Sequence, residues 1–236
     1  SGNSLYLLRI NSQGTILWKK RLSSSIDYQM PNTKDFNTLI NLGNENYVIG
    51  FTESISSENS FTVIIKFDAN GTILAQKRLT FDNYIFELNG ISSVSNKIGL
   101  YGRSVTNNEP INRGLIIELD TNLSSIIKIF ESDTVGSVND LIYKNQNYFV
   151  RGRTYDQHDF FVEFSESSNN VNIINTKHYQ GPVIYNLKYN DDHLYTETYN
   201  RFDAIISKID YNFNPIWTKK FEFVNIHYAL GILSHV

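Results

Sequence analysis

The chain contains no cysteine, and this absence excludes a disulfide framework, a thiolate metal site and a cysteine nucleophile. No apolar run approaches the roughly 20 residues that a membrane-spanning helix needs. Neither charge sign dominates, because 21 basic residues stand against 24 acidic ones. We therefore expect no membrane span and no nucleic-acid partner. The chain opens at Ser1 without an apolar signal segment, almost inside the first expected strand, which favours a mature or trimmed form.

Aromatic and β-branched residues are abundant, with 15 tyrosines and 15 phenylalanines in 236 residues, which favours strands over helices. The clearest unit is residues 61–79, where two strand-like runs flank the turn Asp68-Ala69-Asn70-Gly71. An Asn-Gly pair supplies the positive φ of a tight hairpin turn. Weaker copies of this hairpin occupy residues 4–22, 113–130, 159–179 and 202–221.

A second kind of hairpin lies between these copies, at residues 36–53, 88–104, 138–154 and 183–199. Its turns are rich in Asn and Asp. Taking the first turn residue of each copy as a marker, the repeat spacings are 57, 52, 45 and 45 residues, which is the range of β-propeller blades. The markers are Asn11, Asp68, Asp120, Ser165 and Asp210.

Joining the two hairpins gives four strands per repeat, so the sequence predicts an all-β fold, a β-propeller of about five four-stranded blades. We expect the last blade to be shared between the N- and C-termini, with residues 228–236 as its inner strand. Such a closure removes a free sheet edge, although the shared blade would lack its second strand. No proline/glycine linker divides the chain, so residues 1–236 are expected to form one propeller domain.

The unit of third strand, turn and outer strand, clearest at residues 7–22 and 205–221, resembles the repeats of pyrroloquinoline-quinone-like and related bacterial β-propellers. Those repeats read as an apolar strand, Asp, two residues, Gly, and a strand with Trp near its middle. Trp18 and Trp217 stand at that Trp position, and Gly14 and Gly71 match the turn glycine, whereas Leu123, Ser168 and Phe213 depart from it. The resemblance implies a fold and carries over no cofactor or activity.

Three asparagines align on the expected inner strands, with Ile184 and Leu230 at the same place in the other two repeats. They are Asn37, Asn89 and Asn139. Their amides could form a polar ring at one channel mouth, suited to a sugar or a peptide backbone. The alternative is that they only satisfy nearby backbone groups. The next aligned position holds Thr38, Gly90, Asp140, Tyr185 and Gly231, so Asp140 is the one carboxylate of that ring.

Two arginines, Arg103 and Arg153, align after a glycine, with Phe51 and Thr198 at the same place elsewhere. They could clamp a carboxylate, sulfate or phosphate. The alternative is cross-strand ion pairs with the aligned acids Glu118 and Glu163. Four tyrosines expected in loops are further candidates for ligand contact: Tyr28, Tyr84, Tyr155 and Tyr179. The acids Asp35 and Glu87 also align and could approach each other.

The five histidines show no metal-binding spacing, and the phosphate-binding and nucleophile-elbow motifs are missing, so we expect no metal, no cofactor and no catalytic residue. The sequence therefore favours a non-catalytic scaffold that presents loops to a protein partner. A carbohydrate-binding, lectin-like propeller is the alternative, with a glycan as partner, and a glycoside hydrolase or lyase is the second alternative. The resemblance and the Asn-, Ser- and Tyr-rich composition point to a bacterial protein outside the cytoplasm, in the periplasm, on the cell surface or secreted.

Overall fold

The structure is a computed structural model that describes residues 6–22, 27–29, 38–56, 59–106, 112–132, 135–156, 158–167, 170–179, 184–190, 193–199 and 203–222. These residues form 19 strands and no helix. All strand pairs are antiparallel. Within these ranges, no helix is long and apolar enough to cross a membrane.

The strands form five sheets, which we name blades 1 to 5 in chain order. Blade 1 contains β1 (Tyr6–Ile10) and β2 (Ile16–Arg21). Blade 2 contains β3 (Asp27–Gln29), β4 (Leu39–Gly43), β5 (Asn46–Ser56), β6 (Asn59–Asp68) and β7 (Ile73–Leu79). Blade 3 contains β8 (Ile85–Val94), β9 (Lys97–Val105), β10 (Arg113–Asp120) and β11 (Ile126–Ser132). Blade 4 contains β12 (Val135–Lys144), β13 (Asn147–Thr154), β14 (Asp159–Ser167) and β15 (Asn170–Tyr179). Blade 5 contains β16 (Ile184–Asn190), β17 (His193–Tyr199), β18 (Asp203–Ile209) and β19 (Pro215–Glu222).

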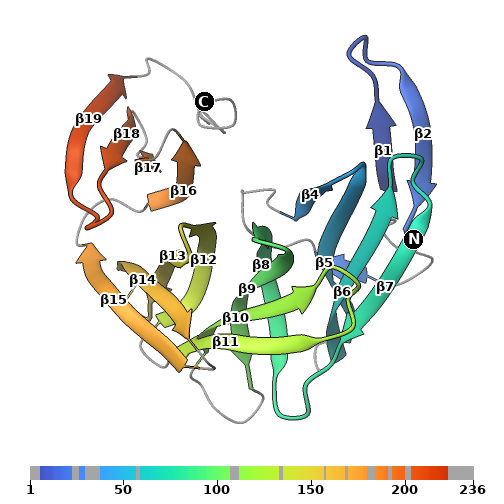
Figure 1. Cartoon of the computed structure of the whole chain (residues 1–236), viewed down its shortest axis with the longest axis horizontal. Helices are drawn as coiled ribbons and strands as arrows, with labels where there is room; N and C mark the ends of the chain where they lie inside the picture. Colours follow the sequence, from blue (N-terminus) through green and yellow to red (C-terminus); the bar gives the residue numbers. More distant parts are fainter. Residues whose placement is uncertain are drawn as a thin grey trace.

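The blades stand side by side around a common centre, with β4, β8, β12 and β16 innermost and β7, β11, β15 and β19 outermost (Figure 1). In blade 2 both β3 and β4 pair with β5, so together they take the place of one inner strand. This confirms the prediction of an all-β propeller of about five blades. The strand expected at residues 228–236, and with it the sharing of a blade between the termini, lies outside the described residues.

The third strands of blades 2, 3 and 4 are buried on both faces because each lies between two neighbouring blades. Ile64 of β6 contacts the core shared with blade 3, whereas its neighbours Val63 and Ile65 contact the core shared with blade 1. Side chains on a strand alternate between faces, so a strand with two buried faces becomes a continuous apolar run. This explains the apolar runs in the third strands, which are TVII at residues 62–65, LII at residues 115–117 and FFV at residues 160–162.

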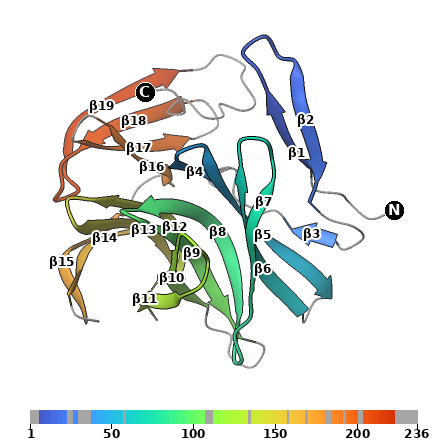
Figure 2. The same cartoon turned by 45° about the vertical axis from the view of Figure 1, so that its right-hand side comes forward.

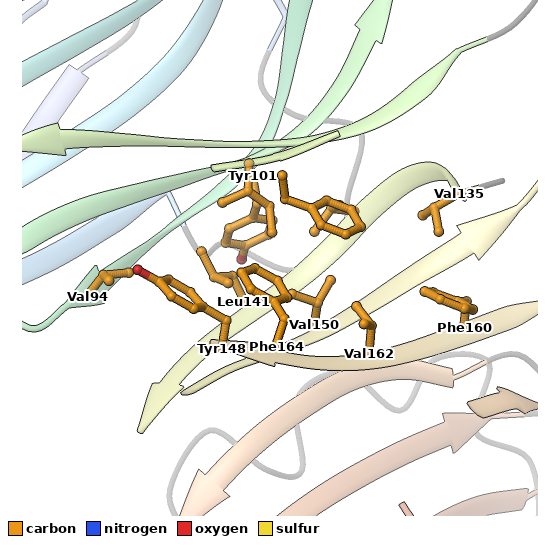
Figure 3. Packing of buried hydrophobic residues seen from close by; sticks show 12 residues of the cluster. Val94, Tyr101, Val135, Leu141, Tyr148, Val150, Phe160, Val162 and Phe164 are labelled. Atoms are coloured by element: carbon orange, nitrogen blue, oxygen red, sulfur yellow. The ribbon is translucent and has the colours of Figure 1, made fainter. Parts of the chain in front are cut away.

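The junction between blades 3 and 4 is the largest aromatic core. Tyr101 of β9 and Phe130 of β11 meet Tyr148, Val150 and Phe164 of blade 4 (Figure 3). The rings of Tyr148 and Phe164 stack with centroids 4.7 Å apart. Such pairs add to the area-based stabilisation and fix how the two sheets are placed.

The turn between third and outer strands has the same geometry in the four blades where it is described. The carboxylate or amide at its first position, as in Asp68, accepts hydrogen bonds from the backbone N–H groups two and four residues later. The fourth position has positive φ, at Gly14, Gly71, Leu123 and Phe213. Leu123 and Phe213 tolerate this conformation while their side chains enter the cores between blades. The turns are therefore packing elements as well as connections.

Candidate functional site at the inner strands

The inner strands β8, β12 and β16 each contain a β-bulge at the same place. In β8 the bulge lies between the pairs Leu88–Gly102 and Gly90–Tyr101. In β12 it lies between Val138–Gly152 and Asp140–Arg151, and in β16 between Ile184–Thr198 and Asn186–Glu197. The extra residues are therefore Asn89, Asn139 and Tyr185. A bulge re-aims a side chain and is common next to functional sites.

This register corrects one part of the sequence alignment. Tyr185, not Ile184, stands at the asparagine position of blade 5, and Asn186 stands at the position of Asp140. The alignment slipped because Tyr185 follows Asn139 by 46 residues, whereas the third strands of the same two blades, as at Phe161 and Ile206, are only 45 residues apart. Asn37 and Leu230, the other two members of the expected ring, lie outside the described residues.

Asn89 links two inner strands. Its Nδ2 donates to Ser137 Oγ and to Val138 O, both at 2.7 Å and both on the inner strand of blade 4. This agrees with the alternative that the amide satisfies backbone groups. Asn89 therefore positions the strand that carries Asn139.

Asn139 occupies the same bulge position in blade 4 but is bound differently. Its Oδ1 is buried and accepts no hydrogen bond from the described residues. A buried acceptor without a donor costs about 1–3 kcal/mol, and such atoms in proteins often mark a functional site. Of the two asparagines of this ring that the structure describes, Asn139 has a buried side-chain carbonyl oxygen that accepts no hydrogen bond from the described residues.

Asp140 follows this bulge and belongs to a buried ion cluster. Its Oδ2 lies 2.6 Å from Arg151 Nε, and the side chain of Arg151 is 2% exposed. Arg151 Nη1 also lies 3.4 Å from Asp159 Oδ1. Two carboxylates around one guanidinium make this cluster acidic, and its charges are largely satisfied within the fold. Asp140 was predicted as the one carboxylate at its aligned position; the equivalent residues of blades 3 and 5 are Gly90 and Asn186, and Asp140 itself is paired with Arg151.

The same cluster joins blade 4 to the inner strand of blade 5. Asp159 Oδ2 accepts a hydrogen bond from Ile184 N at 2.7 Å, and Asp140 Oδ2 accepts one from Leu187 N at 3.1 Å. Arg151 donates to Ile184 O. The charged groups thus hold the backbone of β16 directly beside the bulge that contains Asn139.

The two arginines predicted as a clamp are engaged, but with other acids than expected. Arg103 Nη2 lies 2.6 Å from Glu87 Oε2, and Arg153 Nε lies 3.9 Å from Asp159 Oδ1. The predicted pairs with Glu118 and Glu163 are therefore wrong.

The predicted acid partners are bound elsewhere. Glu118 is paired with Lys97 and accepts from Tyr148, while Glu163 accepts from Asn147 at 2.7 Å. The pairing failed because Glu118 and Glu163 lie near the turn ends of their strands, whereas Arg103 and Arg153 lie at the opposite ends. The register also places Thr52 and Tyr199, rather than Phe51 and Thr198, at the arginine position.

The four tyrosines belong to different parts of the fold. Tyr84 stacks on Phe81 with ring centroids 4.7 Å apart, and burial together with the charge of Glu131 raises its pKa. Tyr155 is largely exposed and lies against Gly136. Tyr28 and Tyr179 belong to strands β3 and β15, so their prediction as loop residues is wrong. The expected approach of Asp35 to Glu87 lies outside the described residues.

Sequence reasoning missed the central residues Arg151, Asp159, Asn186 and Glu197. Asn186 Nδ2 donates to Glu197 Oε2 at 2.8 Å, and Glu197 is completely buried. A charged or amide residue in the middle of an apolar second strand was the available signal, since charges are rarely buried unless they are paired.

No protein-family model matches the chain, and no curated protein sequence matches it. Solved structures do match. A chimera of apocarotenoid oxygenase and RPE65, and a Synechocystis apocarotenoid oxygenase variant, each match 92% of this chain at 11% identity and a TM-score of 0.58. The neuraminidase-like protein of subtype N11 from a flat-faced bat influenza A virus (H18N11) matches 91% at 11% identity and a TM-score of 0.53. The chain spans 55% of the length of the two oxygenase structures and 66% of the neuraminidase-like protein.

These matches show the propeller fold and correct the predicted function. The sequence favoured a non-catalytic scaffold, yet the matched proteins include an oxygenase, which is an enzyme, so that prediction is wrong. A cobalt-substituted form of the oxygenase is also similar, over 75% of this chain with a TM-score of 0.54. In the described part of the present chain, no three His, Cys, Asp or Glu side chains are grouped as a metal site would need.

Proposed function

We propose that this chain forms part of a propeller enzyme that binds a small substrate, rich in hydroxyl or amide hydrogen-bond donors, at the inner-strand bulges of blades 3 and 4. The buried and unpartnered Oδ1 of Asn139 carries this proposal. A substrate O–H or N–H would satisfy that oxygen, and the gain is large where water is excluded.

The surroundings support a prearranged site. Asn89 fixes the inner strand of blade 4 from one side, and the cluster around Arg151 fixes the inner strand of blade 5 from the other. Residues held in this way present a ligand group with little loss of conformational entropy on binding. The likeness to an oxygenase and a neuraminidase-like protein supports catalysis rather than simple presentation of loops.

The finer family assignment is also a proposal. Trp18 and Trp217 occupy equivalent positions, opposite Arg9 and Lys208 of the third strands, which is what repeats of the pyrroloquinoline-quinone-like type would place there. The location outside the cytoplasm stays a prediction from the sequence.

The test uses the whole chain and two substrate panels suggested by the matched proteins. Release of the fluorophore from umbelliferyl glycosides, including the N-acetylneuraminic acid glycoside, reports glycoside hydrolysis. Apocarotenals have no hydrogen-bond donor for Asn139 Oδ1 and form the contrasting panel, in which a change in visible absorption would report oxidative cleavage in the presence of dioxygen and no turnover is expected. We expect turnover in one panel, and loss of at least tenfold in kcat/KM on Asn139→Leu.

The matched control is Asn89→Leu, which changes the same bulge position in the neighbouring blade. We expect it to lower thermal stability, whereas Asn139→Leu keeps or raises the stability because it removes an unsatisfied acceptor. Absence of turnover and of saturable ligand binding in both panels would overturn the proposal. So would an active Asn139→Leu protein with an unchanged KM.

A further inference from the structure

Blades 1, 2 and 4 each reach across to the turn of the following blade, so this contact recurs along the chain. Trp18 Nε1 of blade 1 donates to Ala69 O in the turn of blade 2 at 2.9 Å. Lys66 Nζ of blade 2 donates to Thr121 O of blade 3 at 3.0 Å. Asn175 Nδ2 of blade 4 reaches Tyr211 O of blade 5 at 3.5 Å. In all three turns the acceptor is the carbonyl that directly follows the first turn residue.

A lysine of the outer strand makes a second, parallel contact. Lys77 Nζ donates to Ser124 O at 3.0 Å, and Lys177 Nζ donates to Phe213 O at 2.9 Å. Lys20 of blade 1 comes close to Gly71, within 3.2 Å of the position that a Cβ would take. Because turn carbonyls carry partial negative charge, a lysine or an indole N–H fits them well.

The strand register gives blade 5 the same set of donors. Lys208 pairs with Trp217 as Arg9 pairs with Trp18, and Lys219 lies opposite Ile206 as Lys77 lies opposite Ile64. No following blade is present among the described residues to receive these donors. The side chains of β19 are exposed along the whole strand, and Trp217 is 36% exposed.

Blade 1 presents the complementary face at the other end of the row of blades. On β1, Tyr6, Leu8 and Ile10 are 43%, 50% and 61% exposed. Their equivalents on β6, Val63, Ile65 and Phe67, are each at most 4% exposed because blade 1 covers them. Figures 1 and 2 both show blades 1 and 5 as the two ends of the row.

The turn of blade 1 also has the same geometry as the turns that receive the contacts from a preceding blade. Asn11 Oδ1 accepts from Gln13 N and Thr15 N, as Asp68 Oδ1 accepts from Asn70 N and Thr72 N. Gly14 has a φ of 81°, and Gly71 has a φ of 74°. Ser12 O is therefore the counterpart of Ala69 O, the acceptor of Trp18.

We propose that the outer face of blade 5, formed by Lys208, Trp217 and Lys219, docks onto the turn at residues 11–14 of the chain's own blade 1. The contact would repeat the one between blades 1 and 2, with Trp217 donating to Ser12 O and Lys219 lying beside Gly14. It would cover the apolar face of Tyr6, Leu8 and Ile10. The proposal rests on the blade register and does not depend on the proposed enzymatic function.

The chain's lack of cysteine makes a cross-linking test clean. Gln13→Cys is combined with Lys219→Cys, and the matched control combines Gln13→Cys with Thr218→Cys. Thr218 neighbours Lys219 but points to the other face of β19, where its hydroxyl bonds to Ser207 at 3.0 Å. All three positions are exposed, so folding is retained and is checked by circular dichroism.

Both proteins are treated at low concentration with a short bis-maleimide, and the products are separated by mass. We expect an intramolecular cross-link in the 13/219 protein that forms at least tenfold faster than in the 13/218 protein. Covalent dimers would show that a second copy is the occupant, and that result would overturn docking within one chain. Equal rates in the two proteins, or no cross-link in either, would also overturn the proposal.

Discussion

The junction between blades 3 and 4 and the junction between blades 4 and 5 use the same three positions with opposite chemistry. In blade 3 these positions hold Gly90, Tyr101 and Gly114, and in blade 4 they hold Asp140, Arg151 and Asp159. Tyr101 lies over Gly90 so closely that a Cβ there would meet its hydroxyl at 2.3 Å.

In blade 4 the same space holds an arginine between two aspartates. One register thus accommodates either a large aromatic ring packed against a glycine or a buried ion cluster. The difference teaches that the blade geometry fixes the volume available at these positions, whereas the side chains that fill this volume differ from repeat to repeat. The apolar solution stabilises without demanding partners, while the ionic solution depends on every member being present.

The largest expected effect comes from breaking the ionic junction. Arg151→Ala leaves the two aspartates buried without their cation, and we expect a loss of about 3–5 kcal/mol in the free energy of unfolding. Urea titration followed by circular dichroism measures it. Arg103→Ala removes a half-exposed pair with Glu87 and should cost less than about 1 kcal/mol. Equal losses in the two variants would contradict the comparison.

Copying the apolar junction into blade 4 sharpens the same comparison. The triple variant Asp140→Gly, Arg151→Tyr and Asp159→Gly reproduces the blade 3 set, so no charge of the buried cluster itself is left unpaired, while the partly exposed Arg153 loses its contact with Asp159. We expect it to recover at least half of the stability that Arg151→Ala loses, since a packed apolar group can replace a buried ion cluster. A triple variant that is less stable than Arg151→Ala would show that the ions are required for this junction.

The apolar junction has its own buried carboxylate. Glu118 is completely buried, is paired with Lys97, and accepts a hydrogen bond from the hydroxyl of Tyr148. Tyr148→Phe keeps the aromatic stacking on Phe164 and removes this donor, so we expect a loss of about 1.5–3 kcal/mol. Phe149→Leu is not a suitable control, because that side chain faces the other junction. Val150→Ala is the control, because it changes packing in the same core without removing a hydrogen bond. When Glu118 is also replaced by Gln, the loss of unfolding free energy caused by Tyr148→Phe should change, whereas the loss caused by Val150→Ala should stay the same.

The fold could be predicted from the sequence because its signals are local and repeated. The turn at Asp68 recurs at Asn11, Asp120 and Asp210, and the apolar third strands are visible as β-branched and aromatic runs. Ser165, the turn marker expected in blade 4, instead lies within β14, where it pairs with Asn172. The site could not be predicted to the same depth. The inner strands of blades 4 and 5 are 46 residues apart, from Asn139 to Tyr185, whereas their third strands are 45 apart, and this difference put Ile184 in the place of Tyr185. A propensity pattern also does not show a bulge.

The ion-pair partners of the charged residues also could not be predicted from the sequence. Arg103 and Glu118 are both on blade 3 and look like a cross-strand pair, yet Arg103 is paired in the register with Gly114, and Glu118 with Gly99. Ion pairs depend on which end of a strand each residue occupies, and the repeat pattern alone does not fix the register.

The two bulge asparagines separate stability from ligand binding. Asn89→Ala removes two hydrogen bonds to blade 4, and we expect a loss of about 1–2 kcal/mol. Asn139→Ala removes an oxygen that accepts no hydrogen bond from the described residues, so its unfolding free energy should change by less than about 0.5 kcal/mol. Thermal unfolding of both variants measures the contrast. A larger loss for Asn139→Ala would assign it a structural role.

The smallest effect is expected in the turns, where blade 1 has an amide and blade 3 a carboxylate. Hydrogen bonds from Ser124 and Ser125 lower the pKa of Asp120 far below its ordinary value. A carboxyl whose pKa is lower in the folded state stabilises above its ordinary pKa, and this contribution is lost as the pH falls toward the lowered value. Asp120→Asn should therefore lower the melting temperature slightly at pH 7, and the difference should shrink at pH 2.5. Asn11→Asp is the matched reversal, and it should raise the melting temperature at pH 7 more than at pH 2.5. If both differences were independent of pH, the charge of the turn residue would contribute nothing, and the amide and carboxylate turns would be equivalent.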